Sequence, residues 1–394
     1  MGAIDLINLF ESKYDCSACS ACKHICPRSA ISMEADEEGF LYPKIDEESC
    51  IGCKKCLLVC PIKQPPIPQG KLNPPQIYAI KHKSEDVRSS STSGGVFTAI
   101  SDYVLEEDGL VYGAAFDEKM ELVHKSASGK KARDELRGSK YIQSNLSDTY
   151  GQIISDLGED KKVLFSGTPC QTAGLINLLK MLKIDYSNLT VVDIVCHGVP
   201  SPMVWQDHIK DLEESKDQKL LKYTFRDKSR GWRGYKICVE YEDGELDDKS
   251  DKALLYINLY KTNKTIRPCC YRCRFANTKR PSDLTMGDYW GIEKVFRDFD
   301  DGRGVSLLYL NTKKGQEIYK KISKDLVAYE SSVKKSLQSN LRRPTAETPD
   351  RRAFWRDYKK RGYKYAGKKH TKKSILRRIK IKTLLLIKQV KAYR

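Results

Sequence analysis

The chain has 394 residues and a hydrophobic content of 40%, a length typical of two or three domains. No run approaches the roughly 18 apolar residues of a membrane span, and the first fifteen residues lack the basic and apolar regions of an export signal. We therefore expect a cytoplasmic protein. Of the net charge of +18, residues 351–394 carry +17. A nearly neutral body excludes a nucleic-acid-binding protein with a basic face.

Residues 1–63 hold eight of the fourteen cysteines in two copies of one pattern, thirty-four residues apart. Since the cytoplasm keeps thiols reduced, they indicate metal ligands rather than disulfides. Each copy is the C-x2-C-x2-C-x3-C-P run of bacterial ferredoxins, in which the fourth cysteine ligates the other cluster. Zinc prefers two separated C-x2-C pairs, and buried apolar cysteines would not repeat a spacing. We assign one 4Fe-4S cluster to Cys16, Cys19, Cys22 and Cys60, and a second to Cys50, Cys53, Cys56 and Cys26.

Four regions follow one another along the chain. Two strands, at 30–33 and 40–45, are expected between the cysteine runs, so residues 1–63 should form an α+β ferredoxin-like domain. Residues 64–75 contain five prolines and are typical of a stiff linker. Residues 76–345 alternate short β-rich runs with helical patterns, which predicts an α/β domain with a largely parallel sheet. Residues 346–394 form a basic tail.

A second group of cysteines is expected in the α/β domain. Residues 161–166 and 189–195 are predicted parallel strands, because both are nearly continuous apolar runs. Cys170 follows the first strand after a short turn and Cys196 follows the second directly, so both should lie at the carboxyl ends of neighbouring strands, where open α/β sheets bind ligands. Together with the cysteines at 269, 270 and 273 they could hold a third cluster. The alternative is that Cys170 and Cys196 are small buried hydrophobic residues.

Several motifs in this domain resemble one family. They are Gly-Thr-Pro-Cys-Gln at 167–171, Cys-His-Gly-Val-Pro-Ser at 196–201, and Cys270-x-x-Cys273 followed by Arg-Pro-Ser-Asp-Leu-Thr-Met-Gly-Asp-Tyr-Trp-Gly at 280–291. They are similar to the coenzyme F420 (deazaflavin) hydrogenase/dehydrogenase beta-subunit family, as are 91–95, 138–141 and 225–232. The resemblance runs to about residue 315. It implies FAD and a third 4Fe-4S cluster on Cys170, Cys196, Cys270 and Cys273. Cys269 is an extra thiol, and the choice between it and Cys270 stays open.

A flavin would also explain the chemistry, because clusters pass single electrons whereas most organic reductions need two. No G-x-G-x-x-G motif follows a strand, which argues against a Rossmann site. The segment 91–95 opens a helical pattern at 96–105, and a helix start with small and hydroxylated residues suits a phosphate; the alternative is an ordinary N-cap. The flavin-binding residues we expect are Ser91, Thr92, Ser93, Gly94, Gly95, Ser139, Lys140, Tyr141, Gly167, Thr168 and Pro169.

Three residues are candidates for catalysis. Lys140 could pair with a flavin phosphate or with the anionic reduced ring, although a Ser-Lys-Tyr triplet is also common on surfaces. His197 could donate to a cluster sulfur or protonate a substrate. Asp288 is a comparable candidate for catalysis. The alternative for His197 is a structural hydrogen bond.

The tail contains a segment, Ser374 to Tyr393, that can be wound as a basic amphipathic helix. Such a helix suits an anionic membrane surface and would place the protein at the inner face of the membrane. The alternatives are a partly disordered tail or docking on an acidic partner.

The sequence therefore predicts an iron–sulfur flavoprotein oxidoreductase. Electrons would pass between the ferredoxin-type clusters and FAD, and from FAD to an organic acceptor, either the deazaflavin coenzyme or a glycan-pathway substrate. The expected partners are a redox protein, which would be a ferredoxin or an oxidoreductase subunit, and a small-molecule acceptor. The alternative is a non-catalytic electron-transfer subunit of a larger redox complex.

Overall fold

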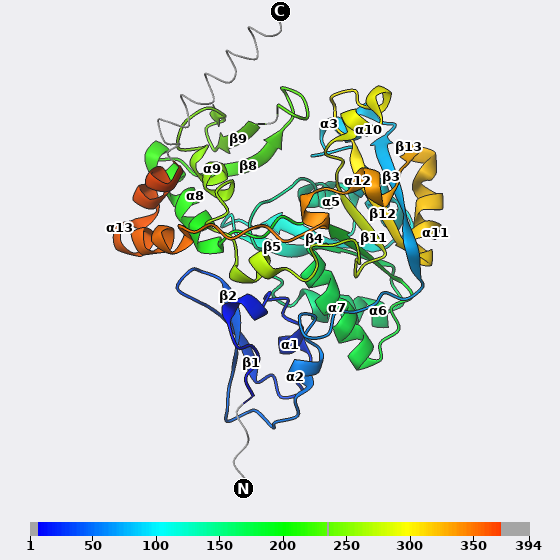
Figure 1. The fold of residues 1–394 in the computed structure, drawn as a ribbon, viewed down its shortest axis with the longest axis horizontal. Coiled ribbons are helices and arrows are strands. Elements are labelled where there is room, and N and C mark those ends of the chain that lie inside the picture. The colour runs from blue at the N-terminus through cyan, green and yellow to red at the C-terminus, as the bar shows by residue number, and fades with distance from the viewer. Residues whose placement is uncertain (1–6, 235, 372–394) are drawn as a thin grey trace, which may run out of the picture.

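A computed structural model describes residues 7–234 and 236–371 (Figure 1). A large central sheet forms the middle of the molecule. The cysteine-rich module, defined as residues 7–63, lies below it in Figure 1, next to α7 (Pro169–Leu182) and α6 (Thr149–Gly158). A helical lobe with a small sheet occupies the upper left of the same view.

The central sheet has eight strands, and its order places the predicted strands side by side. That order is β13 (Leu326–Glu330), β3 (Lys71–His82), β12 (Ser306–Thr312), β11 (Leu284–Asp288), β7 (Leu189–Ile194), β6 (Val163–Gly167), β4 (Leu110–Phe116) and β5 (Leu122–Ala127). The pairings β11–β7, β7–β6 and β6–β4 are parallel, and the four outer pairings are antiparallel. The expectation of a largely parallel sheet therefore holds for the four central strands.

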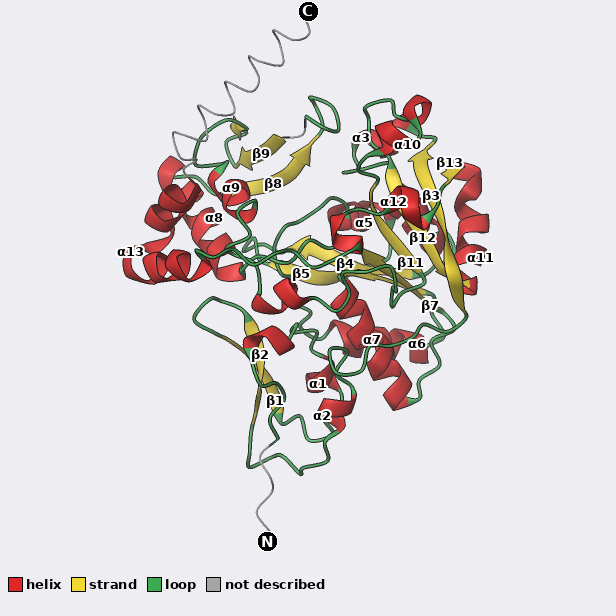
Figure 2. Ribbon diagram, in the orientation of Figure 1, coloured by secondary structure: helices red, strands yellow, loops and turns green. Residues whose placement is uncertain are grey.

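The central strands are buried on both faces, which explains why they are almost continuously apolar. Side chains alternate between faces along a strand. Val163 and Phe165 pack with α6, α7 and the cysteine-rich module. Leu164 packs on the opposite face with α4 (Val96–Leu105) and α11 (Lys313–Ile322). The two faces of the sheet therefore carry different partners: α6, α7 and the cysteine-rich module on one, and α4 and α11 on the other. Figure 2 shows α6, α7 and the module below the sheet.

The other helices are short connections or belong to the helical lobe. They are α1 (Ala21–His24), α2 (Lys55–Leu58), α3 (Glu85–Ser89), α5 (Lys130–Leu136), α8 (Pro202–Lys216), α9 (Leu255–Tyr260), α10 (Ile292–Val295), α12 (Val333–Ser336) and α13 (Arg351–Thr371). The predicted strands of the cysteine-rich module form an antiparallel pair, β1 (Ile31–Ala35) and β2 (Leu41–Ile45). The remaining strands, β8 (Leu220–Asp227), β9 (Lys236–Tyr241) and β10 (Leu246–Asp247), form an antiparallel sheet in the helical lobe.

Two expected boundaries differ from the structure. The second half of the segment expected as a linker is the start of β3, because residues from Lys71 onward enter the sheet. Residues 351–371 of the expected tail form α13, two helical segments joined at Gly362. Phe354, Tyr358 and Tyr363 are buried in a core with α8, α9 and Trp205. This part of the tail is therefore folded into the body, in spite of its many Lys and Arg residues.

The membrane-binding helix predicted for 374–393 lies outside the described residues. Within the described ranges, no helix is long and apolar enough to cross a membrane.

The packing of α13 can be tested with Phe354→Ala. Phe354 is fully buried, so its removal should lower the free energy of unfolding by about 3–5 kcal/mol. The exposed neighbour Arg356 is a matched control, because Arg356→Ala should change it by less than about 0.5 kcal/mol. Chemical denaturation of the full chain measures both variants. An equal effect of the two would mean that α13 is not part of the core.

Candidate redox site

The two cysteine runs of the module share one backbone geometry. In the first run Ala18 and Ser20 have φ values of +53° and +62°, and in the second run Gly52 and Lys54 have +68° and +58°. These pairs are thirty-four residues apart, like the cysteines themselves. Left-handed residues are uncommon outside glycine, so their recurrence indicates that both loops turn in the same way around a common kind of ligand.

The module's cysteines line two small cavities, and the grouping follows the crossed assignment. Cys16, Cys19, Cys22 and Cys60 line the first, together with Cys56. The second is lined by Cys26, Cys50, Cys53 and Cys56. We call these groups the inner set (Cys16, Cys19, Cys22 and Cys60) and the outer set (Cys26, Cys50, Cys53 and Cys56). Burial raises the pKa of the Cys19 and Cys22 thiols, so their thiolates need a positive partner such as iron.

Five further cysteines meet between the module and the central sheet, and we call them the third set: Cys170, Cys196, Cys269, Cys270 and Cys273. Cys170 lies at the start of α7 and Cys196 follows β7, whose parallel pairing with β6 is as predicted. Cys170 interacts electrostatically with Cys196, Cys269 and Cys273. A Cβ on Gly198 would lie 3.3 Å from Cβ of Cys270, so the loop after Cys196 packs on that residue. Burial raises the pKa of Cys196 to about 12.

A buried ion pair joins two of the segments that carry the third set, the strand before Cys196 and the loop after Cys273. Asp193, in β7, accepts hydrogen bonds from Nη2 and Nε of Arg280 at 2.8 and 3.2 Å. Both side chains are almost completely buried. Arg280 also donates to the carbonyl oxygens of Phe275 and Ile194. The loop after Cys273 is thereby fastened to the strand that leads to Cys196.

The structure leaves the choice between Cys269 and Cys270 open. A hydrogen bond between the two thiols, with Arg267 beside Cys269, lowers the pKa of Cys269 and raises that of Cys270. Both residues interact with Cys196. These interactions do not settle which cysteine is a ligand: within the described residues, no group of three or more cysteine, histidine or acidic side chains is arranged to hold a metal ion. Cys270 stays a prediction.

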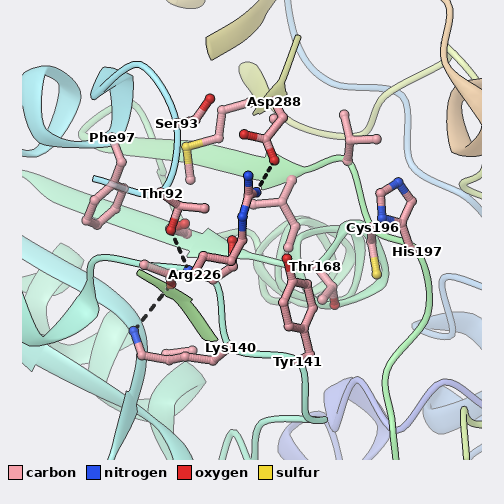
Figure 3. A pocket seen from close by; sticks show the side chains of 18 of the residues that line it. Thr92, Ser93, Phe97, Lys140, Tyr141, Thr168, Cys196, His197, Arg226 and Asp288 are labelled. Carbon is pink, nitrogen blue, oxygen red and sulfur yellow. Dashed lines mark hydrogen bonds and ion pairs between the residues drawn. The ribbon is translucent and has the colours of Figure 1, made fainter. Parts of the chain in front are cut away.

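A cavity of about 490 Å³ opens above the carboxyl ends of the parallel strands (Figure 3). It brings together most of the residues expected to bind a flavin and all three candidates for catalysis. Of those residues, the lining includes Ser91, Thr92, Ser93, Gly95, Ser139, Lys140, Tyr141, Gly167, Thr168, His197 and Asp288, as well as Cys196. One cavity thus connects the 91–95 loop with the third set.

Two of the expected flavin-binding residues do not line this cavity. Gly94 is buried behind the loop, where its N–H donates to Oγ of Ser306 at 2.9 Å and a Cβ would lie 2.3 Å from the Ile80 carbonyl oxygen. Pro169 is the buried first residue of α7. Both residues shape the cavity wall from behind, so a bulky residue at 94 would disturb the loop's packing on the sheet itself.

The 91–95 loop is held from both sides before α4 begins. Nζ of Lys228 donates to the carbonyl oxygens of Arg88, Ser93 and Arg303, at 2.6, 3.1 and 2.8 Å. Oγ1 of Thr92 accepts the Ser139 N–H at 2.9 Å. The start of α4, whose first residues line the cavity, therefore faces it on a fixed loop, an arrangement that favours an anion.

Two basic side chains at the cavity have strongly lowered pKa values. Burial lowers the pKa of Lys140 to about 7, and its ammonium group donates to the Arg137 carbonyl oxygen at 2.8 Å. Burial also lowers the pKa of His124 to about 4, and its Nε2 lies 3.2 Å from the Ser166 carbonyl oxygen. No motif surrounds His124, so the sequence does not predict it as a site residue; its place in β5 beside β4 brings it to the cavity.

Asp288 is engaged by neighbouring side chains. It forms an ion pair with Arg226 and accepts a hydrogen bond from Nε1 of Trp232 at 3.0 Å. Trp232 stacks on Trp290, with ring centres 4.8 Å apart. Figure 3 shows Arg226 and Asp288 pointing toward each other at the cavity. Because both carboxylate oxygens of Asp288 already have partners, this arrangement suits a role in orienting Arg226 better than a role in accepting a proton from a substrate. Arg226 lies in the motif at 225–232, but the sequence alone does not assign it a role.

His197 lines the cavity directly after Cys196, as Figure 3 shows. Burial lowers its pKa, so the imidazole is neutral near neutral pH. Its backbone carbonyl oxygen accepts a hydrogen bond from Thr345 at 2.8 Å. A neutral imidazole beside the third set is positioned to donate one hydrogen bond, which is compatible with either predicted role.

Two parts of the chain match known families. Residues 160–336 match the family model for the C terminus of the beta subunit of coenzyme F420 hydrogenase/dehydrogenase, and residues 15–63 match the model of a 4Fe-4S dicluster domain. Residues 160–336 are thus similar to the C-terminal domain of this beta-subunit family. The resemblance inferred from the sequence motifs is confirmed, and the iron–sulfur nature of the module is supported.

Relatives of this beta-subunit domain are distant. F420-dependent formate dehydrogenase 1 subunit beta of Methanococcus maripaludis is 22% identical over 251 residues, which cover 64% of this chain and 60% of that protein. Coenzyme F420-dependent sulfite reductase of Methanocaldococcus jannaschii is 25% identical over 348 residues, 86% of this chain and 50% of that protein. The chain thus spans little more than half the length of these curated relatives.

One solved structure gives a weaker match. A chain of the F420-reducing NiFe hydrogenase complex from Methanosarcina barkeri aligns with 67% of this chain and 84% of its own length, at 19% identity and a TM-score of 0.44. A similarity at this level carries no argument about function.

The assignment of ligands can be tested by counting iron. Anaerobically prepared protein should contain about twelve iron and twelve sulfide ions if all three sets hold 4Fe-4S clusters. Cys170→Ser should remove about four of each and leave the signals of the module intact. Cys238→Ser is a matched control, because Cys238 belongs to none of the three sets, and it should lose none. Eight iron ions in the unmodified protein would contradict the third cluster.

Proposed function

We propose that this protein is an iron–sulfur flavoprotein that transfers electrons between a redox partner and an organic two-electron acceptor. The observation that carries the proposal is the single cavity shared by Cys196 and the 91–95 loop. It would let a flavin lie against the third set. Clusters supply one-electron transfer, and a bound flavin would supply the exchange between one-electron and two-electron chemistry.

The residues around the cavity fit a flavin. Its volume falls within the range of about 300–1,000 Å³ typical of small-molecule sites. Phe97, Tyr141 and Trp290 offer ring surfaces, and the start of α4 offers N–H groups for a phosphate. At a pH below its pKa, Lys140 supplies a positive charge. The matched families and relatives name F420 and 4Fe-4S clusters, so FAD rests on this fit and on the sequence resemblance.

The outer set is the proposed point of contact with the redox partner. Cys53 is exposed, and the neighbouring side chains Ile51 and Leu58 are 58% and 51% exposed. Exposed lysines at 54 and 55 lie beside them. Apolar side chains with a few positive charges suit a transient contact with an acidic electron carrier such as a ferredoxin. Cys19 of the inner set lies against α7, where a Cβ on Gly174 would be 3.0 Å from its Sγ.

The acceptor is proposed to be the deazaflavin coenzyme, because the distant relatives are named as F420-dependent enzymes. A glycan-pathway substrate stays the second prediction. The relatives that are named as beta subunits favour the alternative in which this chain hands electrons to a larger complex. Reduction of deazaflavin coenzyme by the isolated chain would separate these cases, since a non-catalytic subunit would reduce nothing by itself. A cytoplasmic location, with the tail at an anionic membrane, is part of the proposal.

The flavin can be tested with a charge placed in the cavity. Purified protein should release FAD on heating, and Ser139→Glu should lose most of it, because the new carboxylate would repel the phosphates. Ser89→Glu is the matched control: Ser89 is exposed and lies outside the cavity, so the variant should keep its FAD. Full FAD content in Ser139→Glu would contradict the site, and protein without any flavin would contradict the proposal.

Lys140 should make flavin binding depend on pH. Above its pKa of about 7 the amine is neutral in the flavin-free site, and pairing with an anion then requires uptake of a proton. FAD affinity should therefore fall as pH rises from one unit below this pKa to two units above it. In Lys140→Met the affinity should be lower and nearly independent of pH over this range. Equal slopes in both proteins, measured by titration of flavin-free protein, would remove Lys140 from the site.

A further inference from the structure

Arg267 is a fully buried charged side chain at the contact between the cysteine-rich module and the body. Its Nε and Nη2 donate to the carbonyl oxygens of Cys16 and Leu41, at 2.8 and 2.9 Å, and its Nη1 donates to Oε1 of Gln143 at 3.1 Å. The guanidinium also stacks on Tyr42, 4.1 Å from the ring centre. All three hydrogen-bond acceptors are neutral.

This lack of a carboxylate distinguishes Arg267 from the other buried arginines. Each of the others forms an ion pair: Arg88 with Asp301, Arg133 with Asp102, Arg226 with Asp288, Arg280 with Asp193, and Arg351 with Glu38. Within 7–234 and 236–371, no carboxylate forms an ion pair with Arg267. A buried charge without a negative partner is strongly destabilising, so the folded protein needs a compensating negative charge nearby. The Cys269 thiol, whose pKa is lowered by its hydrogen bond with Cys270 and by its contact with Arg267, is one group that can supply it.

The available negative charge lies in two cysteine sets. Arg267 contacts the backbone of Cys16, a member of the inner set, and it precedes Cys269 and Cys270 of the third set by only two and three residues. A 4Fe-4S cluster held by four thiolates is anionic, and reduction adds one more negative charge. A fixed positive charge at short range stabilises that reduced state.

We propose that Arg267 is the counter-charge of the junction between the inner set and the third set, and that it favours the reduced state of the inner centre. The inference rests on the proposed function, since it requires clusters at these cysteines. Arg267 acts as a positioning charge: it does not touch a substrate. None of the hydrogen bonds described for Arg267 reaches a cysteine of the outer set, so the outer centre should not depend on it.

The test compares variants of the full-length holoprotein in a redox titration followed by electron paramagnetic resonance. Cys53→Ser identifies the outer signal. Arg267→Gln removes the charge, and Gln143→Glu keeps it but gives it a carboxylate partner of nearly the same shape. Arg267→Lys keeps a positive charge at this position. Arg356→Gln removes an exposed arginine and serves as a control. Iron content is measured first in every variant.

At a fixed solution potential, the ratio of reduced to oxidised inner centre should fall on the order of tenfold in Arg267→Gln. It should fall less in Gln143→Glu, and stay near the original value in Arg267→Lys and Arg356→Gln. The outer centre should not shift. An unchanged inner ratio in Gln143→Glu with full iron content would overturn the inference, even if Arg267→Gln fails to hold its clusters. Unmodified protein without iron–sulfur signals would overturn the proposed function instead.

Discussion

The close approach of α7 to the loop of Cys19 is the contact on which the redox arrangement depends. A Cβ on Gly174 would lie 3.0 Å from both Cβ and Sγ of Cys19, and 3.2 Å from the hydroxyl of Tyr150. A larger residue at position 174 would require the Cys19 loop or Tyr150 to shift by a few tenths of an ångström, so glycine favours this contact. Cys170 lies one turn before Gly174 in α7, so the same helix carries a member of the third set and the surface on which Cys19 of the inner set rests. One missing side chain therefore brings the Cys19 loop against the helix that carries Cys170.

Polar contacts fix the parts around this helix. Arg280 and Asp193 join the loop of Cys273 to β7, and Arg267 joins the module to the body. Arg351, the first residue of α13, donates to Oε1 of Glu38 at 2.8 Å in the module and to the hydroxyl of Tyr271 at 3.2 Å. A residue near the end of the chain thus clamps the module next to Cys270. Together with the burial of Phe354, Tyr358 and Tyr363, this contact joins the first part of the basic segment to the folded body.

The sequence predicted the parts of the site that depend on local spacing. The repeated cysteine runs, the strands before Cys170 and Cys196, and the helix at 96–105 all lie where they were expected, because each is encoded by neighbouring residues. The extent of β3 and the burial of α13 were missed. The proline-rich composition of the first segment predicts a linker and the basic composition of the second predicts an exposed tail, and the few apolar side chains in each do not change these predictions. Arg267 and His124 were missed for another reason. Their roles arise from contacts between segments far apart in the chain, which no single motif records.

The central claim is that the inner set and the third set form one junction. In fully reduced protein, two such close clusters should interact magnetically, so the resonance of the inner centre should be broadened or split. The inner and outer centres are also neighbours, since Cys56 lines both cavities, so the comparison is made with Cys53→Ser, which removes the outer centre. In that background Cys170→Ser should restore a simple signal for the inner centre. An inner signal that is identical with and without the third centre would contradict the account.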